Sequence, residues 1–194
     1  MKTVVWDVDD VLNNLMGEWF RRSWLAAHPE CRLDYAKITA NPPHEILGTT
    51  KDEYLQSLDH FRMNEFASLK PVPVFMDWFQ AKGHLAHHVA LTAVPLFAAP
   101  VSGGWVFSNF GNWIRSFNVV PSFRSGADLP FTSETKAEFL CHFGKVDVLI
   151  DDNSEVIESV RRLGIHAIQV PRPWNGLKGS EIDVLHELEE VLFS

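Results

Sequence analysis

The chain has 194 residues, a formal net charge of −8 and a hydrophobic fraction of 46%. This length suits one core domain, or a core with a small insert, and such a chain can bury a sizeable hydrophobic core. The acidic balance argues against a broad nucleic-acid surface, which needs a basic stripe, but it does not exclude a small phosphorylated substrate. Cys31 and Cys141 match no metal-ligand spacing, and we expect both to be reduced thiols.

No stretch of the sequence approaches the roughly 20 apolar residues of a membrane span. The N-terminal segment reaches an acidic residue at Asp7, which is too early for the apolar region of a secretory signal. We therefore expect a cytoplasmic protein without membrane or nucleic-acid polymer partners, and the sequence does not indicate its oligomeric state.

Strand and helix patterns alternate along most of the chain. The expected elements are a strand at 3–8, a helix at 12–27, a loop-rich stretch at 30–50, helices at 51–67 and 74–82, a strand at 85–92, a helix at 103–117, a strand at 118–123, a helix at 134–142, a strand at 146–151, a helix at 155–163, a strand at 165–170 and a helix at 181–192. Ser133, Ser154 and Ser180 are the expected N-caps of the last three helices.

Apolar strands that alternate with helices predict an α/β fold, with a parallel sheet covered by helices on both faces. Residues 14–72 are the exception, because they follow the first strand without a strand of their own. We interpret them as a small helical cap inserted over the carboxyl end of the sheet. The core would then comprise residues 1–13 and 73–194.

The acidic signals fall at the carboxyl ends of predicted strands, where ligands bind in open α/β sheets. Asp7 and Asp9 are two residues apart at the end of the first strand and can share a face. Asp151 and Asp152 end the strand VDVLI. Neighbouring carboxylates repel one another and attract a cation, and ligands that are all oxygen suit Mg²⁺. The competing interpretation is that both clusters are helix caps or solvated turns.

Two further polar residues occupy suggestive positions. Thr92 ends the strand in VALTAV, where a hydroxyl and free backbone N–H groups could hold phosphate oxygens, although most such threonines are only caps. Lys136 lies in the first turn of a predicted helix, which is unfavourable for the helix dipole. A solvated surface lysine is the competing interpretation.

The ordered segments WDVDDV, VALTAV, ETKAEF and VLIDDN together resemble the four motifs of the haloacid dehalogenase superfamily. The resemblance covers roughly 1–13 and 73–194, and it implies a Rossmann-like parallel sheet of strand order 3-2-1-4-5 with Asp7 in the centre. Within the superfamily, the chain resembles most the 5′(3′)-deoxyribonucleotidase-like group. The reasons are Val11 in the first motif, the small helical insert and the late segment VPRPWNGL. Asp10 departs from the glycine that is usual in that group, which bears on the substrate rather than on the chemistry.

The resemblance implies a magnesium-dependent phosphatase. Asp7 would attack phosphorus to form an aspartyl-phosphate, and Asp9 would act as the general acid and base. Mg²⁺ would be held by the Asp7 carboxylate, the Asp9 backbone carbonyl and Asp151, with Asp152 as a further ligand or a supporting group.

By the same resemblance, Thr92, Ala93 and Lys136 would hold the phosphoryl oxygens. The substrate would be a small phosphorylated molecule, with nucleoside monophosphates as one class. Asn13, Asn14 and Trp19 could line the leaving-group pocket, although Trp19 also fits the core of the cap. The alternatives are a non-catalytic protein that binds a phosphorylated metabolite, a phosphomutase and a sugar-phosphate phosphatase.

Overall fold

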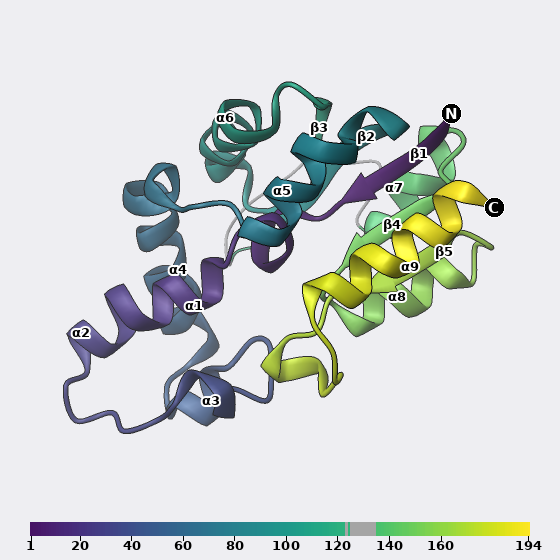
Figure 1. Cartoon of the computed structure of the whole chain (residues 1–194). Helices are drawn as coiled ribbons and strands as arrows, with labels where there is room; N and C mark the ends of the chain where they lie inside the picture. Colours follow the sequence, from purple (N-terminus) through teal and green to yellow (C-terminus); the bar gives the residue numbers. More distant parts are fainter. Residues whose placement is uncertain (123, 125–134) are drawn as a thin grey trace.

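Five short parallel strands form one sheet in the order β3-β2-β1-β4-β5 (Figure 1). The computed structural model describes residues 1–122, 124 and 135–194. The strands are β1 (Lys2–Trp6), β2 (Ala86–Val94), β3 (Ile114–Pro121), β4 (Val148–Asp151) and β5 (His166–Gln169). The predicted order 3-2-1-4-5 is confirmed, and it places the carboxyl end of β1 at the centre of the sheet.

Side chains alternate between the two faces of the sheet, and each face has its own apolar cluster. Val4 and Trp6 of β1 belong to one cluster, while Val5 belongs to the other. The first cluster includes buried residues of α5, α6 and α9, and the second includes those of α7 and α8. These helices are α5 (Pro73–Lys82), α6 (Ala99–Phe110), α7 (Lys136–Phe143), α8 (Ser154–Arg161) and α9 (Glu181–Phe193). Helices on both faces explain why the strands are apolar on both sides.

Residues 14–72 contain helices and loops but no strand. We call them the cap segment. Its α-helices are α1 (Leu15–Trp19), α2 (Leu25–Ala27), α3 (His44–Leu47) and α4 (Lys51–Glu65). They lie beyond the carboxyl ends of the strands (Figure 1). The chain enters and leaves the segment side by side, because Val72 N donates to Leu12 O at 2.8 Å.

The helix predicted at 103–117 is wrong in its second half. The helix α6 ends at Phe110, and Ile114 already belongs to β3. The aromatic residues of this stretch recur at spacings that fit a helix. The strand, however, is specified by its pairing with β2, which periodicity along the chain cannot detect.

Two expected helix starts also differ. The helix expected at 12–27 begins at Leu15 with Asn14 as its N-cap and passes through a π-helical turn at Phe20–Trp24. The last three helices are capped by Thr135, Asn153 and Ser180, so Ser180 is confirmed, whereas Ser154 is the first helical residue rather than a cap. Ser133 and Phe123, at the edges of predicted elements, lie outside the described residues. Among the described helices, none is long and apolar enough to cross a membrane.

Candidate active site

The turn that follows β1 places three aspartates at the centre of the sheet edge. Asp7 N donates to Ile150 O of the neighbouring strand at 2.9 Å, which fixes Asp7 between β1 and β4. The next residues form a tight turn in which Asp10 has a φ of 60°, in the left-handed region. Asp10 Oδ1 accepts from Met16 N at 2.9 Å, and this bond ties the turn to α1.

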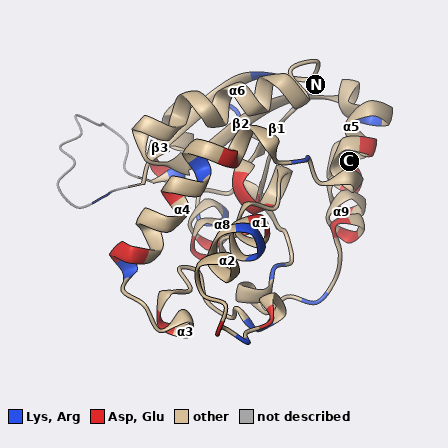
Figure 2. Ribbon diagram, turned by 90° about the vertical axis from the view of Figure 1, so that its left-hand side faces the viewer, with Lys and Arg blue, Asp and Glu red and all other residues tan. Residues whose placement is uncertain are grey.

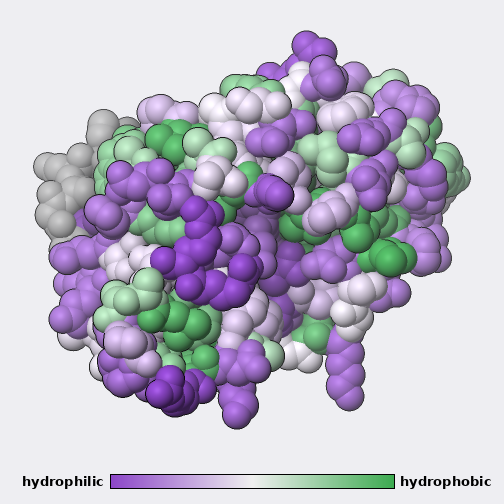
Figure 3. All heavy atoms as spheres, turned by 60° about the vertical axis from the view of Figure 1, so that its left-hand side comes forward, coloured by the Kyte–Doolittle hydropathy of each residue, from purple (hydrophilic) through white to green (hydrophobic). Residues whose placement is uncertain are grey.

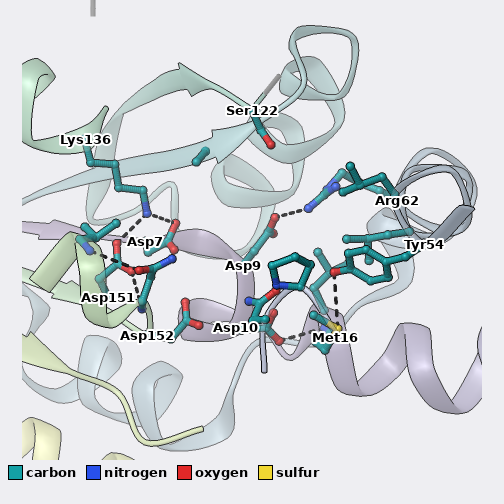
Figure 4. Close-up of a pocket in the computed structure, with 18 of the residues that line it drawn as sticks. Asp7, Asp9, Asp10, Met16, Tyr54, Arg62, Ser122, Lys136, Asp151 and Asp152 are labelled. Atoms are coloured by element: carbon teal, nitrogen blue, oxygen red, sulfur yellow. Dashed lines mark hydrogen bonds and ion pairs between the residues drawn. The ribbon is translucent and has the colours of Figure 1, made fainter. Parts of the chain in front are cut away.

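Three buried carboxylates meet where β1 and β4 end. Oxygens of Asp7, Asp151 and Asp152 lie within 4.8 Å of one another. The ammonium group of Lys136 lies beside them, at 2.8 Å from Asp7 Oδ1 and 2.7 Å from Asp151 Oδ2. Trp174 Nε1 donates to Asp152 Oδ2 at 2.7 Å. The first turn of α7 thus supplies one buried cation to a group of three acids (Figure 4).

Burial and mutual repulsion perturb this group strongly. Burial raises the pKa of Asp7 well above its usual range, Lys136 opposes the rise, and Asp151 and Asp152 add to it. Burial and the neighbouring Asp151 raise the pKa of Asp152 to about 8. Burial alone would lower the pKa of Lys136, but the attraction of Asp151 and Asp7 outweighs it, and the pKa is raised. The single positive charge of Lys136 therefore does not neutralise the negative charge of the three carboxylates.

The residues present fit a divalent cation. Asp7, Asp151 and Asp152 offer three oxygen donors, all from residues no more than 7% exposed, and their excess negative charge favours a positive ion. A set made only of carboxylate oxygens suits Mg²⁺ rather than a thiophilic metal. Asp9, expected to contribute its backbone carbonyl, does not place its side chain in this group.

The side chain of Asp9 points away from the three acids and toward the cap segment (Figure 4). Arg62 of α4 donates from Nη2 to Asp9 Oδ2 at 2.6 Å. The other carboxylate oxygen, Oδ1, has a long contact of 3.5 Å with Asn13 Nδ2. The side chain of Asp7 therefore lies with Asp151, Asp152 and Lys136, whereas the side chain of Asp9 contacts Arg62.

A cavity of about 480 Å³ opens between the carboxylates and the cap segment. Its volume is that of a small-molecule site. The surface is hollowed between the cap segment and the core, with hydrophilic residues around the hollow (Figure 3). The core side of the lining includes Asp7, Asp9, Asp10, Ala93, Ser122, Arg124, Lys136, Asp151, Asp152 and Asn153, and the cap side includes Met16, Asn41, Lys51, Tyr54, Leu55, Leu58 and Arg62.

The two expected phosphate-site residues of β2 differ in position. Ala93 lines the cavity, whereas Thr92 does not. Thr92 is 1% exposed, and its Oγ1 has no hydrogen-bond partner among the described residues. A buried hydroxyl without a hydrogen-bond partner is uncommon, and a ligand oxygen within reach would satisfy it.

The structure does not place the three expected pocket residues in the cavity lining. Trp19 is fully buried within the cap segment, where it packs against Trp24 and Tyr54 and donates to Ser57 Oγ. Asn13 Oδ1 accepts from Asp10 N and Leu15 N, and Asn14 caps α1. Asn13 and Asn14 therefore form hydrogen bonds with nearby backbone groups of the turn and of α1, as short polar side chains often do. Trp19 packs in the core of the cap segment.

Arg62 and Arg124, which the sequence motifs did not indicate, line the cavity, and Asp10, noted from the sequence only as a departure from the usual glycine, lines it too. A signal for Arg62 was present. It follows Leu58 by four residues and Leu55 by seven, so it lies on the apolar face of its helix. A charge on a buried face needs a partner, which is a reason to expect a functional contact. Figure 2 shows acidic and basic residues together on α4.

No protein-family model matches this sequence, and a comparison with curated proteins gives no match. Solved structures do match. A haloacid dehalogenase-like family hydrolase from Streptococcus pneumoniae has a TM-score of 0.61 at 13% identity, over 96% of this chain and 90% of that chain. YfnB from Bacillus subtilis, solved with bound magnesium, has a TM-score of 0.58 at 12% identity, over 98% of both chains. The chain has the fold of the haloacid dehalogenase-like hydrolases.

This fold by itself does not specify a reaction. Protein tyrosine kinase A from Mycobacterium tuberculosis has a TM-score of 0.59 at 14% identity, over 96% of this chain and 97% of that chain. None of these three proteins is described as a nucleotidase, so the resemblance to that group stays a prediction. The function must be argued from the residues of the site.

Proposed function

We propose that the chain is a magnesium-dependent phosphomonoester hydrolase that works through an aspartyl-phosphate on Asp7. The observation that carries this proposal is the position of Asp7. Asp7 directly follows the central strand β1, and its carboxylate contacts Lys136 at 2.8 Å and faces a cavity that Asp9 also lines. A nucleophile, a second carboxylate and a cation around one small-molecule cavity supply what phosphoryl transfer requires.

In the first step, a carboxylate oxygen of Asp7 attacks phosphorus, and the bond from phosphorus to the leaving oxygen breaks. Asp9 gives a proton to that oxygen. Lys136 holds a phosphoryl oxygen, and Ala93, which lines the cavity, is the second candidate contact for the phosphoryl group. In the second step, water attacks phosphorus, Asp9 takes its proton, and phosphate leaves Asp7.

Asp7, Asp151 and Asp152 would hold the magnesium ion. When bound, the ion supplies positive charge that lets an anionic substrate approach an anionic nucleophile. The chain's own contribution is the arrangement of these acids around one lysine, with all four residues buried.

We further propose that residues 14–72 act as a cap that shapes the leaving-group side of the cavity. Tyr54, Leu55 and Leu58 of α4 contribute a partly apolar wall there. An aromatic and apolar wall can accept a nucleobase, which supports nucleoside monophosphates as one substrate class. Sugar phosphates remain the second class, because Lys51 and Asn41 line the same wall with polar groups.

The first test is phosphate release from p-nitrophenyl phosphate and from panels of nucleoside monophosphates and sugar phosphates, with Mg²⁺ or with EDTA. We expect magnesium-dependent release that Asp7→Asn lowers by about 10³-fold or more, because the nucleophile is lost. Asp77→Asn is the matched control, because Asp77 is an exposed residue of α5 outside the cavity lining.

Wild-type protein that releases no more phosphate than Asp7→Asn, across the whole panel, would refute the proposal. Hydrolysis in ¹⁸O-labelled water separates it from the phosphomutase alternative. A hydrolase places the label in inorganic phosphate, whereas a mutase returns an isomeric phosphate ester without it.

A further inference from the structure

The cap segment reaches the acid/base candidate through a single arginine. Arg62 belongs to α4, 53 residues away from Asp9 in the sequence, and its Nη2 lies 2.6 Å from Asp9 Oδ2. The residue Arg62 is 4% exposed, and Asp9 lies between its side chain and Asp7 in the close-up view (Figure 4). Contact at this distance between a buried guanidinium and a carboxylate is a charge-assisted hydrogen bond.

Arg62 is the second member of a chain of four alternating charges. Its Nη1 donates to Asp59 Oδ1 at 3.0 Å. Arg124, which follows β3, donates to both oxygens of Asp59, at 2.6 and 2.8 Å. Asp59 already accepts two short hydrogen bonds from Arg124, so its negative charge does not by itself compensate the buried positive charge of Arg62. The shortest bond of Arg62 is the one to Asp9.

This contact divides the two oxygens of Asp9 between two tasks. Oδ2 is occupied by Arg62, whereas Oδ1 has, among the residues that the structure describes, only the 3.5 Å contact with Asn13. The less engaged oxygen belongs to a side chain that lines the cavity. A carboxylate held by one oxygen presents the other in a fixed direction, and catalytic groups gain much of their effect from such positioning.

We propose that Arg62 is a positioning residue that holds Asp9 from the cap segment, so that Asp9 Oδ1 faces the leaving oxygen of the substrate. The inference rests on the proposed phosphatase function. In the first step the proton moves from Asp9 Oδ1 to the leaving oxygen as its bond to phosphorus breaks. The negative charge that stays on Asp9 then lies against the guanidinium. In the second step the same oxygen receives the proton of the attacking water.

The test is the leaving-group dependence of kcat/KM in Arg62→Gln. The ratio kcat/KM reports the step in which the leaving group departs. An alkyl phosphate needs a proton donor for that step, whereas p-nitrophenyl phosphate has a leaving group that departs readily as an anion. We expect kcat/KM to fall by about 10²-fold for the alkyl ester, in the range of general acid catalysis, and by less than about fivefold for p-nitrophenyl phosphate.

The dependence on Asp9 is tested with the double variant. If Arg62 acts through Asp9, then Arg62→Gln combined with Asp9→Asn should be no slower than Asp9→Asn alone. Arg22→Gln is the matched control, because Arg22 is also a cap arginine, pairs with Glu65 and does not line the cavity. It should leave the leaving-group dependence unchanged.

Arg62→Lys covers the case in which Arg62→Gln does not fold, which circular dichroism would reveal. A lysine keeps the charge but cannot hold Asp9 and Asp59 with two separate nitrogens. We expect it to fold and to give an intermediate loss with the same leaving-group pattern.

Three results would overturn the inference while leaving the phosphatase function intact. They are an equal loss for both esters, a rise in KM alone, and losses that add in the double variant. An inactive wild-type protein would instead refute the proposed function itself, and the inference with it.

Discussion

The ammonium group of Lys136 lies between the carboxylates of Asp7 and Asp151, in a position that is 4% exposed. A helix-first-turn lysine normally extends into solvent, because the helix dipole disfavours a cation there. Here the two acids reverse that preference. We therefore expect the charge of Lys136 to contribute to stability as well as to the proposed binding of phosphate.

We predict that Lys136→Met lowers the free energy of unfolding by about 3 kcal/mol in EDTA, because removing one partner leaves buried charges uncompensated. Saturating Mg²⁺ should recover part of this loss, because the cation would take over the neutralisation. Urea unfolding with and without Mg²⁺ measures both values. An equal loss under the two conditions would contradict the proposed metal site.

At the scale of elements, His88 links β2 to β1 and to the end of α5. Trp6 Nε1 donates to His88 Nδ1 at 3.0 Å, so Nε2 carries the proton and donates to Gly83 O at 2.9 Å. Both ring nitrogens are thus satisfied only in the neutral form. Burial lowers the pKa of His88 to about 4.

The neutral state of His88 makes its contribution to stability depend on pH. In the unfolded chain His88 takes up a proton below pH 6.5, whereas in the folded chain it takes one up only near pH 4. The folded state therefore loses stability as the pH falls from 6.5 to about 4. We predict that the stability difference between wild type and His88→Gln narrows by about 2 kcal/mol from pH 7 to pH 5. Urea unfolding at both values measures it, and a constant difference would contradict the prediction.

The edge strand β3 shows where a local sequence pattern fails to predict an element. The strand β1 and the helix α9 lie close to their predicted positions, because their apolar residues follow the period of the element that forms. The spacing of aromatic residues predicts a helix for Ile114 and Phe117, yet both belong to β3, because pairing with β2 outweighs that spacing.

At the scale of the whole molecule, the proposed metal site joins Asp7, which follows β1, with Asp151 and Asp152 at the end of β4, and these two strands are far apart in sequence. A ligand that binds only the folded state stabilises it, by about 2.7 kcal/mol at 100 times its dissociation constant. We predict that Mg²⁺ raises the melting temperature of the wild type and that Asp151→Asn removes this rise. Differential scanning calorimetry measures it. A rise of the same size in Asp151→Asn would place the ion elsewhere.

The sequence by itself determined the strand ends that carry Asp7 and Asp151, the apolar strands of the core and the absence of a strand from residues 14–72. These follow from local periodicity and from motifs, which are properties of short segments. The tertiary structure alone decided which side chains meet. It buried Trp19 in the cap core instead of the pocket, and it brought Arg62 of α4 against Asp9. Contacts between segments that are distant in the sequence depend on how helices and strands pack, and no local sequence pattern specifies these contacts.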